Sequence, residues 1–352
     1  MSKKMAVFGA GAAGSYIGGF LTREGHDISL IDMWGDHVDK MNNEGLFISG
    51  CQGDFTVPVN AIHLANAIQI EKKFDIIFLA VKSYDTEWAA HFCKRLLKDD
   101  GVIVSNQNCM NDSLISTIVG PSREIGCVMS SITVGLWEPA HVNRGGQPGR
   151  DTGHDVFRVG ELHGRVTRRA EEIADYLSCI DGSKATSNIW GERWSKLTTN
   201  ASSNPVTAMT GLGSNGAAEI PNARRIQIEI SKECSLVGLA QNYQIENIKG
   251  ISADIWARAD EGEIYEELDS KFMPDSGRGD WKSSMSQDVT KGRKSEVLFM
   301  NGYISDEGDR LGIATPVNTA ITQVVDEIDS GLRTPSESNI QEVLIRAGLD
   351  NK

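Results

Sequence analysis

The feature that most constrains this chain is a glycine cluster close to its N-terminus. The apolar run Met5–Phe8 is followed by glycines at G-x-G-x-x-G spacing, and a helical pattern then runs from Ala13 to about Arg23. Such a turn lets the backbone approach a pyrophosphate, and the helix N-terminus supplies free N–H groups and the positive end of a dipole. The spacing therefore predicts a dinucleotide-binding unit, whose candidate cofactor contacts are Gly9, Gly11, Ala12, Ala13 and Gly14.

The next predicted strand, Ile28–Ile31, ends in an acidic residue. Asp32 follows it directly, about 20 residues after the glycines, where a carboxylate can accept both hydroxyls of an adenosine ribose. An ordinary glycine-rich turn is the alternative interpretation. The strand, the turn, the helix and Asp32 together favour a cofactor site.

Composition excludes several classes of protein. The chain has 352 residues, which favours two domains, and its net charge of −13 argues against a nucleic-acid or anionic-membrane partner. No apolar run approaches the roughly 18–20 residues that span a bilayer, and no signal peptide fits before the first strand, so we expect a cytoplasmic protein. The scattered cysteines, without a C-x-x-C pair, predict neither a disulfide framework nor a metal site.

Strands and helices alternate through the first half of the chain. Phe74–Val81 is a nearly continuous apolar run, as expected for a strand buried on both faces of a parallel sheet, and a helix follows at Thr86–Leu97. Lys82 and Asn108 each follow a predicted strand, where ligands bind in doubly wound α/β folds. Their alternative roles are a solvated lysine and a turn asparagine. Further strands are expected at Leu46–Ser49, Asp54–Val59, Val102–Ser105, Gly126–Val134 and Val156–Val159, and helices at Asp36–Asn43 and Val166–Leu177.

The character of the chain changes near Ser187. Strand patterns nearly disappear, so we expect an α/β, Rossmann-like domain over residues 1–187 and an all-α domain over residues 188–352. The expected helices of the second domain are Trp190–Thr207, Asn222–Asn242, Ser252–Asp269, Ser286–Asn301 and Pro316–Gly331.

One predicted helix carries a row of polar residues. Lys196, Asn200 and Asn204 are spaced at i, i+4 and i+8 and share a face. They are interpreted either as a row that lines a cleft, with the lysine polarising a carbonyl, or as a solvated face, and the spacing alone does not decide. The helical half holds no histidine, although the candidate acids His141, His154 and His163 in the first half stay open.

A second polar cluster begins at Ser283-Ser284. Ser284 is expected to cap the following helix. Asp288 and Glu296 would then lie along that helix about two turns apart, where the pattern alone favours surface charge.

Taken in order, these motifs cover nearly the whole chain and resemble those of the ketopantoate reductase (2-dehydropantoate 2-reductase) family. The matching stretches are Gly9–Gly14, Gly25–Asp27, Ala80–Thr86, Gln107-Asn108, Trp194–Lys196 with Asn200 and Asn204, Ser283–Met285 with Asp288, and Glu296 through Asn301-Gly302.

The resemblance implies a reaction and a set of roles. Lys196 would donate a proton to the ketone oxygen, Asn200 and Asn204 would bind polar groups of the substrate, and Ser284 would bind its carboxylate. In addition, Asn108 would lie at the substrate and nicotinamide, Lys82 near the cofactor, and Glu296 on the cofactor side of a closed cleft. A further substrate asparagine falls at Asn215 only after a shift of one residue.

The chain departs from the family at three places. Asp32 stands where NADP-dependent members carry a basic residue, and since a carboxylate would repel a 2′-phosphate, we predict NAD rather than NADP. Cys109 replaces a glycine after Asn108, so a different local turn is expected. After Thr133–Pro139 the chain continues as a long polar loop through Gly153, which predicts a different, bulkier 2-oxo acid.

We therefore predict an NAD(H)-dependent oxidoreductase that transfers a hydride between the nicotinamide and C2 of a 2-oxo or 2-hydroxy acid. One alternative is an authentic NADPH-dependent 2-dehydropantoate 2-reductase of pantothenate synthesis. The other is a catalytically silent dinucleotide-sensing protein. A homodimer formed through the helical domain is expected.

Overall fold

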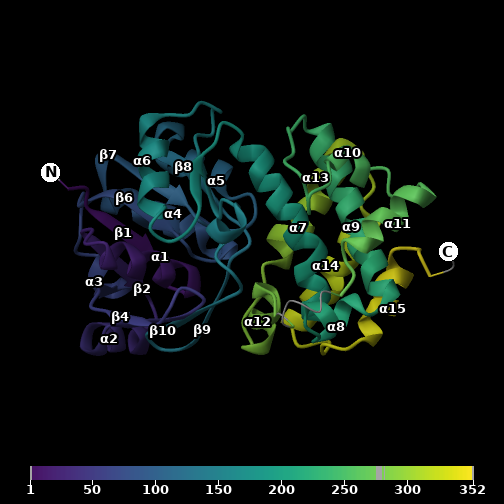
Figure 1. Ribbon diagram of the computed structural model, residues 1–352, viewed down its shortest axis with the longest axis horizontal. Helices are drawn as coiled ribbons and strands as arrows, with labels where there is room; N and C mark the ends of the chain where they lie inside the picture. The colour runs from purple at the N-terminus through teal and green to yellow at the C-terminus, as the bar shows by residue number, and fades with distance from the viewer. Residues whose placement is uncertain (1, 275–279, 281, 351–352) are drawn as a thin grey trace. The chain divides into compact units, whose positions relative to one another are not determined.

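The chain forms two compact units, residues 1–189 and 190–352, in the computed structural model, which describes residues 2–274, 280 and 282–350. The division lies two residues beyond the expected boundary at 187. The first unit combines a sheet with helices, and the second is helical (Figure 1). Within the described ranges, no helix is both long and apolar enough to cross a membrane. The expected fold class is thus confirmed.

A large sheet forms the centre of the first unit. Its strand order is β12-β11-β8-β7-β6-β1-β2-β5, and its pairs are parallel except for β8 with β11. The strands are β1 (Met5–Phe8), β2 (Ile28–Asp32), β5 (Asn60–His63), β6 (Phe74–Leu79), β7 (Leu97–Ser105), β8 (Glu124–Met129), β11 (Phe157–Gly160) and β12 (Ser183–Ala185).

Helices cover both faces of this sheet, which explains its continuous apolar strands. Met5 and Val7 share a core with residues of α1 and α6, whereas Ala6 and Phe8 share the opposite core with residues of α4 and α5. The helices of the unit are α1 (Ala12–Arg23), α2 (Gly35–Glu44), α3 (Leu64–Ala67), α4 (Thr86–Leu96), α5 (Asp112–Val119) and α6 (Arg168–Leu177).

A second, smaller sheet contacts α1. Its order is β4-β3-β10-β9, formed by β3 (Leu46–Gly50), β4 (Phe55–Val57), β9 (Thr133–Glu138) and β10 (His141–Gly145). Strands β9 and β10 pair antiparallel around Ala140, which has φ 56°. The expectation of a long polar loop through Gly153 is therefore wrong over β10. The predicted strand Gly126–Val134 is likewise two strands, the end of β8 and the start of β9.

A buried charge explains why β10 is hard to recognise in the sequence. Val142 and Arg144 both point into the core, at 0% and 1% exposure. Arg144 forms an ion pair with the buried carboxylate of Asp181 and donates from Nη1 to Gln52 Oε1 at 3.0 Å. A strand that alternates apolar and polar residues but buries an arginine among the apolar positions lacks the sequence pattern of an amphipathic strand.

The second unit is built around two long helices, α7 (Ile189–Thr210) and α9 (Pro221–Ala240). They approach closely where Trp194 Nε1 donates to Cys234 O at 2.9 Å, beside Gly238, where a Cβ would lie 2.2 Å from that indole nitrogen. The other helices are α8 (Ser214–Ala218), α10 (Ala253–Trp256), α11 (Gly262–Ser270), α12 (Ser284–Thr290), α13 (Tyr303–Leu311), α14 (Pro316–Asp329) and α15 (Ser338–Arg346).

Two predicted helices are wrong as single elements. The stretch Ser252–Asp269 is divided into α10 and α11, because Glu261 adopts an extended conformation between them. The stretch Ser286–Asn301 ends as a helix at Thr290, followed by Gly292 at φ 63°, a left-handed conformation that terminates helices. A wide π-helical turn, η4 (Leu298–Gly302), then leads into α13.

Candidate functional site

Four neighbouring strands of the large sheet bring the predicted cofactor residues of the first unit to one edge. Strands β7, β6, β1 and β2 are adjacent and parallel, so their carboxyl ends lie side by side. Asn108 follows β7, Lys82 follows β6, the glycine turn follows β1, and Asp32 ends β2. Open α/β sheets bind their ligands at this edge.

Two glycines of the turn are required by the fold itself. Gly9 has φ 92°, and a Cβ there would lie 2.9 Å from the backbone nitrogen of Val81. A Cβ on Gly14 would lie 2.1 Å from Gly9 O, so only glycine lets α1 start this close to β1. Gly11 differs, because among the described residues nothing lies within 4 Å of a Cβ placed there. The open space at Gly11 is available to a ligand.

Gly11 and Gly14 therefore predict different outcomes for the same substitution. Gly11→Ala should cost about 1 kcal/mol of folding stability or less, as an alanine at a helix N-cap, yet weaken NADH binding roughly tenfold or more, by occupying the pyrophosphate approach. Gly14→Ala should cost about 3 kcal/mol or more through the clash with Gly9 O. Urea unfolding and NADH fluorescence titration measure the two effects. Unchanged NADH affinity in folded Gly11→Ala would contradict this role.

Asp32 is half-buried at the end of β2, where its Oδ1 accepts a hydrogen bond from the backbone N–H of Trp34 at 2.9 Å. This bond holds the carboxylate in place beside the turn. The neighbouring Met33 is 62% exposed. A carboxylate at this edge can accept hydrogen bonds from hydroxyl groups, whereas it repels the negatively charged oxygens of a phosphate.

His37, which the sequence analysis did not identify, forms a hydrogen bond to the glycine turn. Its Nδ1 accepts from the backbone N–H of Ala140 at 2.8 Å, so in the neutral ring Nε2 carries the proton and donates to Ala10 O at 2.9 Å. His37 is fully buried and stacks on Trp34. Burial lowers its pKa, with Asp32 acting in the opposite direction. His37 thus connects the glycine turn with the β9–β10 turn.

Amide side chains join the loops that carry Lys82 and Asn108. Gln107 donates from Nε2 to Val81 O at 2.9 Å, and Asn111 donates from Nδ2 to Ser83 Oγ at 3.1 Å. Both loops are thereby held together at the ends of β6 and β7. Lys82 and Asn108 are half-buried, and their roles stay predictions.

Cys109 retains the backbone conformation of a glycine. Its φ is 66°, in the left-handed region, although it carries a side chain that is buried to 5% exposure. The cysteine thus adopts the positive φ that a glycine at this position suggests, and the expectation of a different turn stays a prediction. A non-glycine residue in this region stores roughly 1–2 kcal/mol of strain.

In the second unit, α7 carries the predicted row of polar residues. Lys196 and Asn204 are half-buried and Asn200 is 8% exposed, so a fully solvated face does not describe the row. Their spacing places the side chains along one face over two turns of helix.

The start of α12 is attached to the end of this row. Ser283 Oγ donates to Asn204 O at 3.3 Å and lies 2.8 Å from Thr207 Oγ1. Ser283 also caps α12, since its side chain accepts from the backbone N–H of Ser286 at 3.1 Å. The expectation that Ser284 is the cap is therefore wrong by one residue. Ser284 is the first residue of α12 and is exposed.

Glu296 and Asp288 do not share a helix, contrary to expectation. Asp288 lies in α12, whereas Glu296 lies beyond the break at Gly292. Both residues are buried: Asp288 is 6% exposed and Glu296 is 5% exposed. The adjacent Ser295 is fixed to the end of α14, because its N–H and Oγ donate to Asp329 Oδ2 at 3.0 and 2.6 Å. Asn215, the doubtful candidate, lies in α8, where its backbone N–H donates to Asp280.

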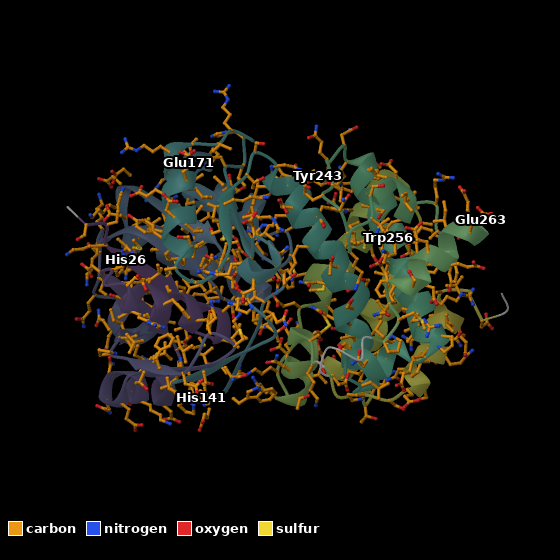
Figure 2. All side chains as sticks on the ribbon, in the orientation of Figure 1. His26, His141, Glu171, Tyr243, Trp256 and Glu263 are labelled. Carbon is orange, nitrogen blue, oxygen red and sulfur yellow. The ribbon has the colours of Figure 1, made fainter. Side chains whose placement is uncertain are left out.

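The histidines left open by the sequence have structural partners in the first unit. His141, labelled in Figure 2, lies on β10 with Nε2 2.8 Å from Ser49 Oγ and Nδ1 2.8 Å from Glu138 Oε1. His154 Nε2 lies 2.8 Å from Ser130 Oγ. His163 lies at 3.7 Å from the carboxylate of Glu161.

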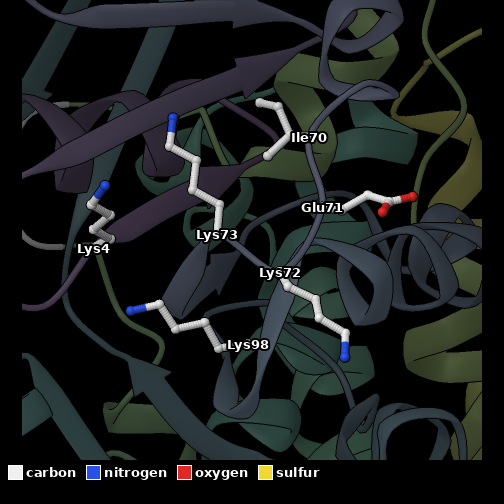
Figure 3. A pocket seen from close by; sticks show the side chains of 6 residues that line it. All are labelled: Lys4, Ile70, Glu71, Lys72, Lys73 and Lys98. Carbon is white, nitrogen blue, oxygen red and sulfur yellow. The ribbon is translucent and has the colours of Figure 1, made fainter.

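A shallow hollow of about 540 Å³ lies at the amino ends of β1, β6 and β7 (Figure 3), opposite to the predicted cofactor edge. Its lining residues are Lys4, Ile70, Glu71, Lys72, Lys73 and Lys98. Lys72 pairs with Asp99 and Lys98 with Asp75, so much of its positive charge is neutralised locally. We assign no function to this hollow.

The chain matches the models of a known protein family in both of its units. The model of the family described as ketopantoate reductase PanE/ApbA matches residues 5–154, and the model of its C-terminal domain matches residues 188–329. A 2-dehydropantoate 2-reductase from Archaeoglobus fulgidus is 27% identical over 332 residues, covering 94% of this chain and 99% of the relative.

Solved structures show the same fold. A ternary structure of D-mandelate dehydrogenase with NADH and anilino(oxo)acetate has a TM-score of 0.79 at 23% identity, covering 94% of this chain and 99% of the other. A PanE/ApbA family ketopantoate reductase from Ralstonia eutropha JMP134 has a TM-score of 0.76 at 25% identity, covering 93% and 99%. The chain therefore belongs to the ketopantoate reductase family of oxidoreductases.

Proposed function

We propose that this protein is an NAD(H)-dependent reductase of 2-oxo acids, which also catalyses the reverse oxidation of 2-hydroxy acids. When bound, NADH would supply a hydride to C2 of the substrate. Lys196 would donate a proton to the developing alkoxide oxygen, so that the ketone gains one hydride and one proton and the lysine loses its proton. The observation that carries the proposal is the Lys196–Asn200–Asn204 row on α7, joined at Asn204 to the start of α12.

The roles proposed for the remaining residues follow from the resemblance to the family. Asn200, Asn204 and Ser284 hold the polar groups of the acid, and Asn108 lies at the meeting point of substrate and nicotinamide. On the cofactor side, the Gly9–Gly14 turn binds the pyrophosphate, and Lys82 and Glu296 contact the cofactor. The helical unit would supply the substrate groups and the surface of a homodimer, which a sedimentation measurement would test.

The cofactor preference rests on Asp32. The double variant Asp32→Ser, Met33→Arg removes the carboxylate and places a cation at a neighbouring exposed position. We expect the ratio of kcat/KM with NADPH to that with NADH to rise at least about a hundredfold, as two tenfold changes of about 1.4 kcal/mol each. Initial rates with each cofactor measure this ratio, with Met33→Ala as the control. A wild-type protein that already prefers NADPH would contradict the argument.

A second candidate function is favoured by the relatives. Proteins named 2-dehydropantoate 2-reductase align with this chain over almost their whole length, as does the one from Archaeoglobus fulgidus. Under this alternative the substrate is ketopantoate and the cofactor NADPH. The residue roles on α7 are the same in both candidates.

One assay separates the candidates. The absorbance of NADH and of NADPH is followed with pure protein and a panel of 2-oxo acids that includes ketopantoate, pyruvate and benzoylformate, the 2-oxo acid of mandelate. The best turnover with NADH and a bulky or aromatic acid supports the proposal, and the best turnover with NADPH and ketopantoate supports the second candidate. Cofactor binding without turnover on any acid would instead indicate a dinucleotide sensor.

A further inference from the structure

Helix α7 contains a proline in its interior, within the row of proposed substrate residues. Pro205 lies immediately after Asn204, and the helix continues to Thr210. Proline has no backbone N–H, so the carbonyl four residues earlier, Ala201 O, lacks its usual helical donor, and the ring crowds that carbonyl. The missing bond falls between Asn200 and Asn204, in the stretch of α7 that sets the spacing of these side chains.

Asn301, from a segment far away in the chain, supplies a donor to this carbonyl. Its Nδ2 donates to Ala201 O at 3.1 Å, across 100 residues of sequence. Asn301 is fully buried and lies in the π-helical turn η4 (Leu298–Gly302). Such wide turns occur frequently at functional sites. A buried carbonyl without a donor would cost folding free energy, so this bond matters for the local structure of α7.

A chain of buried partners determines which way the Asn301 amide faces. Glu233 Oε2 accepts from the backbone N–H of Asn318 at 2.9 Å and from its Nδ2 at 2.7 Å. With its Nδ2 facing the carboxylate, Asn318 turns Oδ1 toward Asn301, whose Nδ2 donates to it at 3.0 Å. The Nδ2 group of Asn301 therefore lies between two acceptors, Asn318 Oδ1 and Ala201 O.

We propose that Asn301 is a positioning residue: its amide replaces the hydrogen bond that Pro205 removes from α7, and together they set the placement of Asn204 relative to Lys196 for the substrate. This inference rests on the proposed function, because it assumes that the α7 row binds the substrate. Beyond the proline, Ser283 Oγ lies 2.8 Å from Thr207 Oγ1 and holds the last turns of α7 against α12. Ala201, before the proline, and Thr207, after it, thus have different partners from elsewhere in the chain.

Stability measurements test the replaced bond. Asn301→Leu, which is close in shape and has no amide, should lower the Tm by roughly 4–8 °C, because the Ala201 carbonyl is left buried without this donor. In a Pro205→Ala background the backbone N–H at position 205 serves the same carbonyl. There, Asn301→Leu should cause roughly half that loss or less.

Kinetic measurements test the placement of Asn204. Pro205→Ala should raise the KM for the best 2-oxo acid at least about tenfold, the loss expected when one oriented hydrogen bond is weakened. The Kd for NADH should stay unchanged, because the proposed cofactor turn lies in the other unit. A role of Pro205 and Asn301 in stability alone would not move KM.

Asn339, on α15, provides a matched control because it also donates to a carbonyl of α7. It is 1% exposed, and its Nδ2 donates to Met209 O, near the end of α7, at 2.8 Å. Asn339→Leu should lower the Tm comparably. The Pro205→Ala background should not reduce that loss, and KM should stay unchanged.

Two results would overturn the inference. Equal Tm losses from Asn301→Leu in both backgrounds would show that the amide does not replace the missing bond, and an unchanged KM in Pro205→Ala would show that the bond does not place Asn204. Asn204→Ala separates this failure from failure of the proposed function. If Asn204→Ala raises KM and Pro205→Ala does not, only the inference fails; if neither raises KM, both fail.

Discussion

Replacing Lys196 by alanine should lower kcat for the reduction of the best 2-oxo acid by about 10²–10⁴-fold, the contribution of a positioned general acid. The side chain is half-buried on α7, one helical turn from Asn200. In the proposed reaction the Lys196 ammonium group donates a proton to the substrate oxygen as hydride reaches C2, and the variant lacks this donor. Stopped-flow or steady-state absorbance of NADH measures the effect.

Two further variants make the Lys196 result specific. Lys196→Arg keeps a positive charge, but a guanidinium does not release its proton at neutral pH, so kcat should stay low while the acid still binds. Lys271→Ala removes an exposed lysine of the same unit and should leave kcat unchanged. Turnover by Lys196→Ala within a few-fold of the wild type would show that another group is the acid.

Replacing Glu233 by alanine should lower the free energy of unfolding by about 4 kcal/mol, because each of several buried donors left without its partner costs roughly 1–3 kcal/mol. Glu233, on α9, is 3% exposed. Its carboxylate accepts from the backbone N–H groups of Val317 and Asn318, each at 2.9 Å, and so caps the N-terminus of α14. The local cap residue, Thr315, makes no side-chain capping bond. Urea unfolding followed by circular dichroism measures the loss.

Glu229, one turn earlier on the same helix, is the control for Glu233. Its carboxylate pairs with Lys232 at 2.7 Å, and Lys232 also pairs with Asp260 at 2.8 Å. Since the lysine keeps a partner, Glu229→Ala should cost about 1 kcal/mol or less. Similar losses for both variants would show that the cap on α14 contributes little.

The same carboxyl group gives the stability a pH dependence. Burial raises the pKa of Glu233 from 4.5 to about 7, against the N–H donors of Val317 and Asn318, which favour the charged form. The folded state therefore holds the proton more tightly than the unfolded state, and this contribution to stability is full below pH 4.5 and declines as the pH rises through 7. Its maximum is about 3 kcal/mol, at 1.36 kcal/mol per pKa unit.

Glu233→Gln removes this titration. The unfolding free energy of the wild type minus that of Glu233→Gln should fall between pH 5 and pH 7.5. Above this range the difference should be constant. Thermal or urea unfolding in a series of buffers measures it. A difference that does not vary with pH would show that Glu233 does not titrate in this range.

Contacts between near neighbours in the chain were accessible from the sequence. Gly9 and Gly14 belong to one strand–turn–helix unit. Their spacing reflects how closely the two backbones approach, since a Cβ on Gly14 would lie only 2.1 Å from Gly9 O. The buried strands of the sheet were recognised because Phe74–Leu79 is apolar on both faces. The row on α7 was found because helical spacing alone brings Lys196, Asn200 and Asn204 to one face.

Residues whose partners lie far away in the chain were missed or misread. His37 contacts Ala10 and Ala140, at separations of 27 and 103 residues, and no local pattern reports such bonds. Strand β10 was read as loop because Arg144 is neutralised by Asp181, 37 residues further on. In each case a polar side chain is buried because a distant partner offsets its desolvation cost.

The sequence by itself determined the buried strands of the large sheet, the glycine turn and the polar row of this oxidoreductase, because each depends on spacing within one or two elements. Only the tertiary structure decided which residues hold these parts in place. The serine that caps α12 is Ser283 because its hydroxyl also reaches Asn204 O, and the donor for Ala201 O is Asn301 because Pro205 leaves that carbonyl without a helical one. These hydrogen bonds form because the tertiary structure brings together donors and acceptors that lack local partners. A buried group left without a partner would cost folding free energy.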